Sequence, residues 1–211
     1  MGLKIYGSAR SRATRVLWLA KELGLAYEHI PLAANDPKLK APDFLKINPA
    51  GRIPAIEDDG GVAMGESLAI NLYLARKYGA QADSSLAPAD AAEEARTAQW
   101  TCWAMTDLEG PMGTVYMHRG FYPEDKREPK VAEAAEAQAQ KPLAMLDGVL
   151  AKSAYLLGDR FTVADLNLAG VLSLTRIGAI DMSGFPHVAA WAKKCHDRPA
   201  AQEVRAMAAA S

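Results

Sequence analysis

The first eighty residues combine two hydrophobic patterns, an alternation typical of β-strands and a wider spacing typical of helices. The run from Asp58 to Gly61 lies between two alternating stretches, which predicts a tight hairpin turn. Gly24 and Gly79 follow helical runs, at the position where glycine commonly ends a helix. The expected elements are a strand at 3–6, a helix at 12–23, a strand at 27–32, a short helix at 42–46, strands at 53–57 and 62–64, and a helix at 67–78. Their order is therefore β-α-β-α-β-β-α.

A short polar stretch at 79–88 carries neither pattern, and we interpret it as a linker to a second half with helical patterns throughout. Ala, Leu, Glu, Lys and Gln are frequent in that half, and these residues favour helices. Pro142 lies inside the second expected helix, where proline should bend the axis. The helices expected here run over 89–118, 126–152, 162–177, 186–197 and 199–209. An α/β half followed by an all-helical half implies two domains, 1–79 and 89–211.

Composition and charge argue against several classes of partner and site. Half of the 211 residues are hydrophobic and 23% are charged, as in a soluble globular protein, and the formal net charge is −1. This balance gives no electrostatic reason to expect a nucleic acid or a membrane as partner, and no apolar stretch reaches membrane-spanning length. Cys102 and Cys195 are far apart and predict neither a metal site nor a disulfide framework. Because the N-terminus has no signal-peptide pattern, we expect a cytoplasmic protein.

Two local features suggest that the first half binds a peptide-like anion. Pro54 follows Ile53 at the entrance to an expected strand, where proline removes a ladder hydrogen bond. A cis bond between these residues would turn the backbone of Ile53 outward, where an extended ligand could pair with it. Ser67, at the start of an expected helix, is either an ordinary N-cap or part of a carboxylate site. Glu66 beside it can accept a hydrogen bond from an ammonium group.

Three segments together resemble the cytosolic glutathione transferase family, and the resemblance covers essentially the whole chain. They are 6–18, similar to a catalytic loop and first helix, 48–56 with 65–67, similar to a glutathione-binding core, and 157–165, similar to a capping motif of the second domain. The resemblance implies a thioredoxin-like α/β domain that binds glutathione, followed by an all-α domain that forms the electrophile site. It also implies a cis Ile53–Pro54 bond, a homodimer, and glutathione as co-substrate.

The resemblance further implies roles for individual residues. Ser11 is the leading candidate to donate a hydrogen bond to the glutathione sulfur, assisted by the positive end of the first helix. Tyr6 ranks second, since its place in a strand also suits packing, and Ser8 ranks third, since it needs a different alignment of the loop. The glutathione-binding residues implied are Lys40, Arg52, Ile53, Pro54, Glu66 and Ser67, with Arg52 favoured for the glycyl carboxylate.

The first long helix of the second half carries Met and aromatic side chains that suit an adaptable apolar pocket. Met105, Met112 and Tyr116 are therefore expected to line the electrophile site, although such stripes more often belong to a core or a dimer contact. Thr162 and Asp165 form a variant capping box, which predicts that Asp165 is buried at a helix start in a structural role.

The expected activity is attack of activated glutathione on a small apolar electrophile. An isomerase of the maleylacetoacetate type is one alternative, but such enzymes carry paired serines before the first helix, whereas two other residues separate Ser8 from Ser11. A transferase-like interaction module without catalytic activity is the other alternative. Such a scaffold has no need of the complete glutathione site that these residues would form.

Overall fold

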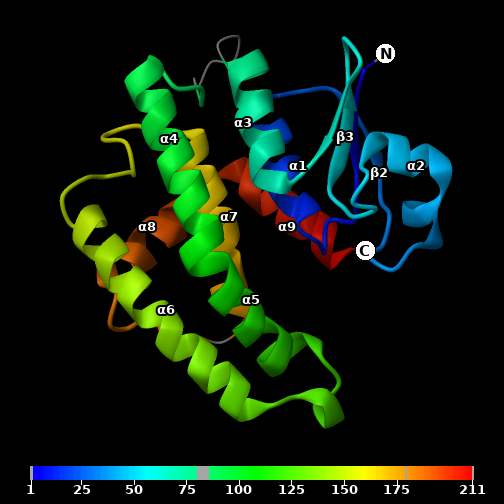
Figure 1. Ribbon diagram of the computed structural model, residues 1–211. Helices are drawn as coiled ribbons and strands as arrows, with labels where there is room; N and C mark the ends of the chain where they lie inside the picture. The colour runs from blue at the N-terminus through cyan, green and yellow to red at the C-terminus, as the bar shows by residue number, and fades with distance from the viewer. Residues whose placement is uncertain (1, 80–85, 179, 211) are drawn as a thin grey trace. The chain divides into compact units, whose positions relative to one another are not determined.

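The computed structural model describes residues 2–79, 86–178 and 180–210, so the expected linker lies partly outside the described residues, at 80–85. The chain divides into two compact units, and Figure 1 labels many of their helices and strands. The first unit comprises Met1–Ala87 and Asp197–Ser211, and the second comprises Pro88–His196. The sequence places the C-terminal helix in the helical domain, whereas the structure groups it with the first unit.

A four-stranded mixed sheet forms the centre of the first unit. Its strands are β1 (Leu3–Tyr6), β2 (Tyr27–Ile30), β3 (Ala55–Asp58) and β4 (Val62–Gly65). Strand β1 pairs with β2 in parallel and with β3 in antiparallel orientation, and β4 pairs antiparallel with β3. The spatial order is therefore β2-β1-β3-β4, which matches the predicted thioredoxin-like arrangement.

The turn between β3 and β4 is the predicted hairpin. Asp58 pairs with Val62, and the central glycines Gly60 and Gly61 have φ angles of 83° and 79°. Three residues, Asp59 to Gly61, lie between the paired ends of the two strands, and glycine adopts the positive φ angles of the last two without a steric cost. The glycine pair therefore fixes the register of β3 against β4.

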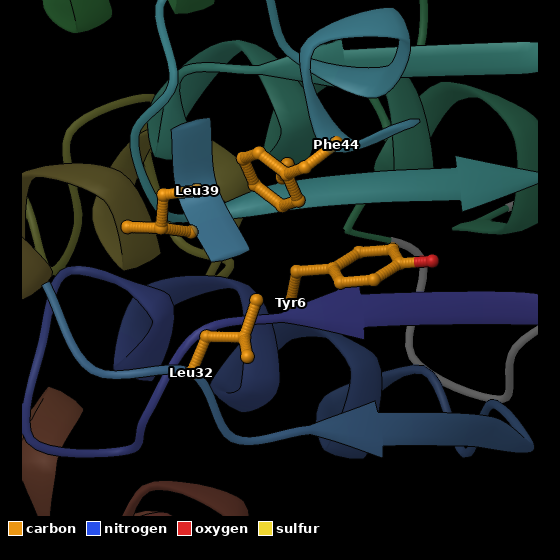
Figure 2. Close-up of a cluster of buried hydrophobic side chains, with 5 residues drawn as sticks. Tyr6, Leu32, Leu39 and Phe44 are labelled. Carbon is orange, nitrogen blue, oxygen red and sulfur yellow. The ribbon is translucent and has the colours of Figure 1, made fainter. Parts of the chain in front are cut away.

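The helices of the first unit pack against the sheet or against one another. They are α1 (Ala13–Glu22), the short 3₁₀ helix η1 (Pro37–Lys40), α2 (Pro42–Ile47), α3 (Ser67–Tyr78) and α9 (Pro199–Ala209). Side chains alternate along a strand, so Tyr6 points to the opposite face from Ile5. On its face Tyr6 packs in a buried apolar cluster with residues from η1, α2 and β3, shown in Figure 2, which comprises Tyr6, Leu32, Leu39, Phe44 and Ala55.

Helix α9 belongs to the first unit because it packs against α1. Arg198, which precedes α9, donates two hydrogen bonds to the carboxylate of Glu22, at 2.7 and 2.6 Å. The same carboxylate accepts from the indole of Trp18 at 2.9 Å, and Lys21 pairs with Glu203 at 2.7 Å. The contacts of Arg198 with Glu22 and of Lys21 with Glu203 join residues more than 170 positions apart in the sequence.

The second unit is entirely helical in its described residues. Its helices are α4 (Ala91–Trp103), α5 (Glu109–Tyr116), a 3₁₀ turn η5 (Glu124–Lys126), α6 (Pro129–Leu150), α7 (Val163–Gly178) and α8 (Pro186–His196). Helix α6 continues without interruption through Pro142. Asp165 is fully buried at the start of α7, where it accepts from the N–H and the hydroxyl of Thr162, each at 3.0 Å, as the capping motif predicts. No helix in the described ranges is long and apolar enough to span a membrane.

The expected helix at 89–118 is interrupted by two π-helical turns, η3 (Ala104–Leu108) and η4 (Met117–Phe121). At the first of them, the N–H of Glu109 reaches back five residues to the carbonyl of Ala104. Pro111 accounts for this turn, since proline has no N–H and its ring excludes an ordinary helical carbonyl four residues earlier.

Candidate functional site

The loop between β1 and α1 closely approaches the Ile53–Pro54 turn at Gly7. Gly7 has a φ angle of 128°, which residues with side chains rarely adopt. A Cβ atom at this position would lie 2.8 Å from the Cβ of Ala13 and 3.1 Å from the Cβ of Ile53. The first residue of α1 and the residue before Pro54 therefore meet across this glycine.

Ser11 lies at the entrance to α1. Its hydroxyl donates to the carbonyl of Ser8 at 2.7 Å, and its oxygen accepts from the N–H of Ala13 at 3.1 Å. The backbone N–H of Ser11 donates to the same Ser8 carbonyl at 3.0 Å. The hydroxyl is thus held half-buried at the positive end of the helix dipole. Rotation of the O–H bond can redirect the proton to another acceptor while Ala13 still holds the oxygen.

The other two candidate hydroxyls have different surroundings. Ser8 is half-buried in the same loop and contributes its carbonyl to Ser11. Tyr6 lies in β1, where its ring packs edge-on against Phe44 at 5.7 Å and its hydroxyl donates to the carboxylate of Glu57. Figure 2 shows that this hydroxyl points out of the apolar cluster. Burial, together with the hydrogen bond and the charge of Glu57, raises the pKa of Tyr6 well above its usual value, which makes it a weak proton donor.

The Ile53–Pro54 bond is cis, as the resemblance implies. Among the described residues, no backbone group pairs with the N–H or the C=O of Ile53. The loop before it is held by Asn48, whose amide nitrogen donates to the carbonyl of Arg52 at 2.7 Å and whose oxygen accepts from the N–H of Ala50 at 3.2 Å. The loop before Ile53 is therefore held in place, while the N–H and C=O of Ile53 have no backbone partner among the described residues.

The two cationic residues that the resemblance implies for glutathione binding lie on this loop (Arg52) and beside it (Lys40). Lys40 donates to the carbonyl of Gly51 at 3.1 Å, and Arg52 is exposed. Gly51 has a φ angle of 59°, and a Cβ atom there would lie 2.8 Å from the Lys40 nitrogen. A glycine at this position therefore lets the lysine close over the loop, where it contacts the residue before Arg52.

Glu66 and Ser67 form the start of α3. Glu66 is the N-cap residue, with a φ angle of 66°, and Ser67 is the first helical residue, so the expected capping role of Ser67 is not the one observed. A positive φ at a residue other than glycine is a strained conformation that clusters at functional sites. Arg15 of α1 is 1% exposed and directs its guanidinium to the Ser67 hydroxyl at 3.4 Å. The first turns of α1 and α3 therefore adjoin.

The residues expected to line the electrophile site separate in the structure. Met105 is 41% exposed and Tyr116 is half-buried, whereas Met112 is fully buried in the core of the second unit. Met105 and Met112 would share a face of a regular α-helix, but the π-helical turn η3 between them changes the helical phase. Met112 is therefore a core residue and does not reach an open surface.

Three residues that support the site were not expected from the sequence. Gly7 separates the start of α1 from Ile53, Asn48 holds the loop before that residue, and Arg15 lies beneath Ser67. Glycine directly after a strand is a recognisable signal, but a buried arginine has no local signature. Within the part of the chain that the structure describes, no group of His, Cys, Asp or Glu side chains is suited to a metal ion.

The chain matches two family models along its length. Residues 10–77 match the glutathione S-transferase N-terminal domain, and residues 106–199 match the glutathione S-transferase C-terminal domain. Glutathione S-transferase 3 of Zea mays is 34% identical over 216 residues, covering 95% of this chain and 92% of the relative. Glutathione S-transferase GstB of Escherichia coli is 30% identical over 192 residues, which cover 90% of each chain. A solved theta class glutathione S-transferase from Xanthomonas axonopodis pv. citri, with glutathione bound, is 30% identical and covers 96% of each chain, with a TM-score of 0.86.

Proposed function

The chain belongs to the glutathione S-transferase family and is an enzyme of that kind, and on this basis we propose that it activates the glutathione thiol as a thiolate for attack on a small apolar electrophile. The observation that carries the proposal is the meeting of Ala13 and Ile53 across Gly7. Ala13 also donates its N–H to the Ser11 hydroxyl oxygen, which supports placing the sulfur of a ligand bound along the Ile53 backbone near Ser11.

Glutathione is an extended tripeptide with a charged group at each end, and each part has a counterpart in the first unit. Its cysteinyl backbone pairs with the N–H and C=O of Ile53, in the manner of an added strand. The γ-glutamyl carboxylate binds at Ser67 and the first turn of α3, where backbone N–H groups and the helix dipole favour an anion. Glu66 accepts from the neighbouring ammonium group, and Arg52 with Lys40 meets the glycyl carboxylate.

In this arrangement the hydroxyl of Ser11 leaves the carbonyl of Ser8 and donates to the sulfur. The N–H of Ala13 continues to hold the oxygen, so the donor keeps its position during the exchange. The proton of the thiol passes to solvent, the thiolate attacks the electrophilic carbon to form a thioether, and the leaving group departs with the bonding pair. Positive potential at the start of α1 adds to the stabilisation of the thiolate.

Activation of the thiol supplies only part of the rate enhancement. Lowering a thiol pKa from about 8.5 to about 6.5 raises the thiolate fraction at neutral pH roughly 25-fold. The less basic thiolate is a poorer nucleophile by roughly 8-fold, which leaves a net gain of about threefold. The remaining rate enhancement must come from holding the electrophile beside the sulfur. We assign this role to the second unit, through Met105 and Tyr116, and we exclude the buried Met112.

The proposal is tested by titrating glutathione into the protein at neutral pH and following thiolate absorbance in the ultraviolet. Conjugation to an activated aryl chloride is measured on the same samples. Ser11→Ala is compared with Ser8→Ala, because Ser8 contributes only its backbone to the hydrogen bonds described above. We expect a saturable thiolate signal in the wild type and in Ser8→Ala, and its loss in Ser11→Ala.

Other outcomes point to different assignments. A signal that persists in Ser11→Ala but disappears in Ser8→Ala would move the donor role to Ser8. A signal that persists in both variants would leave Tyr6 or the backbone of the loop as the donor. No binding and no thiolate signal in the wild type would contradict the proposal and favour a non-catalytic interaction module.

A further inference from the structure

His29 of β2 reaches the loop that carries Ser11. Its Nε2 atom lies 2.9 Å from the carbonyl oxygen of Gly7. A backbone carbonyl can only accept a hydrogen bond, so the contact requires the proton on Nε2. The half-buried imidazole therefore donates to the residue at which α1 and Ile53 meet.

The hydrogen bond from His29 is one of three that tie this loop to β2 and the residues after it. The N–H of Gly7 donates to the carbonyl of Ile30 at 2.9 Å, and the N–H of Ser8 donates to the carbonyl of Leu32 at 2.8 Å. The carbonyl of Gly7 and the N–H of Ser8 belong to the same peptide group. This peptide group therefore forms a hydrogen bond through its carbonyl and another through its N–H. Hydrogen bonds on the two sides of a peptide group polarise and strengthen one another.

The next peptide group along the chain holds Ser11. The carbonyl of Ser8 accepts from the hydroxyl of Ser11 at 2.7 Å and from its N–H at 3.0 Å. Movement of the Gly7–Ser8 peptide would therefore shift Ser11. At Gly7 the close approach to Ala13 and Ile53 leaves little room, so a small rotation changes the distance between the hydroxyl and the Ile53 backbone.

We propose that His29 is a positioning residue, whose hydrogen bond to the Gly7 carbonyl places the Ser11 hydroxyl and so sets the fraction of bound glutathione that is thiolate. This inference rests on the proposed function, because it requires glutathione at Ile53. His29 acts through the loop and makes no contact with the sulfur. Its loss should therefore reduce thiolate formation and turnover more than it weakens binding of the tripeptide.

The test compares His29→Leu, which removes the donor, with His29→Gln, whose amide nitrogen can take the place of Nε2. Glu28→Gln is the matched control, since Glu28 is the exposed neighbour on the same strand and, within the described residues, its side chain forms no hydrogen bond or ion pair with the loop, although its charge acts on Tyr6. The measurements are thiolate absorbance against pH at saturating glutathione, kcat and KM for conjugation, and the unfolding midpoint of each protein. If His29→Leu does not fold, His29→Asn replaces it, because its shorter amide does not reach Gly7.

We expect the thiolate-to-thiol ratio of glutathione bound to His29→Leu to fall by about fivefold at neutral pH, the factor that one lost hydrogen bond supplies, with KM for glutathione changed by less than about twofold. The value of kcat should fall by a smaller factor, because the more basic thiolate is the better nucleophile. His29→Gln and Glu28→Gln should match the wild type. An unchanged thiolate fraction in His29→Leu would overturn the inference while leaving the proposed function intact. A loss in His29→Gln equal to that in His29→Leu would also overturn it. A wild type with no thiolate signal would contradict both the inference and the proposed function.

Discussion

The indole nitrogen of Trp191 in α8 lies 3.0 Å from the carboxylate of Asp165 at the start of α7. The same carboxylate accepts from the N–H of Leu156 at 2.9 Å and from the N–H and hydroxyl of Thr162. Asp165 is fully buried, so if its carboxylate were removed, water could not take its place as the acceptor for these donors. The carboxylate therefore joins two helices and the loop between 151 and 162.

We expect Asp165→Ala to lower the free energy of unfolding by about 3 kcal/mol or more, because it leaves several buried donors without an acceptor. Glutathione affinity of the protein that remains folded should not change, since Asp165 lies in the second unit and contacts no proposed ligand. Denaturant unfolding and a glutathione titration measure the two effects. Asp159→Ala, at an exposed position of the same loop, is the control. Equal stability of Asp165→Ala and the wild type would refute this role.

Gly7→Ala should damage both stability and the glutathione site. The added methyl group would lie 2.8 Å from the Cβ of Ala13 and 3.1 Å from that of Ile53, at a φ angle that alanine rarely adopts. We expect a loss of about 2–4 kcal/mol in unfolding free energy and weaker binding of glutathione. Calorimetric unfolding and isothermal titration with glutathione test the two effects.

Gly158→Ala serves as a control that distinguishes the two causes of the stability loss in Gly7→Ala, the strained φ angle and the steric collision. Gly158 has a φ angle of 117° but no atom within 4 Å of the position its Cβ would take, so its substitution introduces backbone strain without a collision. A larger loss at Gly7 than at Gly158 would therefore report the close approach of Ala13 and Ile53. Equal losses of unfolding free energy in the two variants, with glutathione binding retained in both, would show that the close approach of Ala13 and Ile53 does not shape the glutathione site.

Tyr6→Phe separates packing from catalysis. The hydroxyl of Tyr6 is bonded to Glu57, which also lies 3.7 Å from the ammonium of Lys4. Removing the hydroxyl should cost about 1 kcal/mol of stability and leave the thiolate signal and kcat unchanged. A thiolate titration and a denaturant unfolding curve on the same preparation of Tyr6→Phe measure these two effects. A collapse of the signal with retained stability would instead assign sulfur activation to Tyr6.

Local sequence signals predicted the parts of the fold that local geometry controls. The glycine pair Gly60 and Gly61 specified the hairpin, because this tight turn needs positive φ angles that glycine readily takes. The position of Pro54 at a strand entrance pointed to a cis bond once the family resemblance was added. The residues assigned to the glutathione site stay a prediction, which rests on their order along the chain.

Features that depend on distant residues were missed. The contact between Arg198 and Glu22 places α9 with the first unit, and no local periodicity predicts such a pair. The π-helical turn η3 adds a change of phase that a regular helical spacing does not contain, so Met112, expected with Met105 and Tyr116 to line the electrophile site, is instead fully buried in the core. Likewise, Arg15 beneath Ser67 depends on the packing of α1 against α3.

A buried carboxylate ties the hairpin to the end of α3. Asp58, at the end of β3, accepts from the ammonium of Lys77 at 2.7 Å and from the hydroxyls of Tyr73 and Tyr78, each at 2.8 Å. It also accepts from the N–H of Asp59 at 2.8 Å. Burial alone would raise the pKa of Asp58, but these four donors outweigh it and hold the pKa below its usual value.

The stability contributed by Asp58 should therefore depend on pH. A carboxyl whose pKa is lowered by folding stabilises the protein fully above its unfolded pKa, about 3.9, and loses that contribution as the pH falls through the folded value. We expect Asp58→Asn to lower the unfolding free energy near neutral pH by about 2 kcal/mol, with the difference from the wild type shrinking towards about pH 3. Denaturant unfolding at a series of pH values measures this difference, with Asp125→Asn at an exposed position as the control. A difference that stays constant down to that pH would show that the ionised form of Asp58 is not what holds α3 to the hairpin.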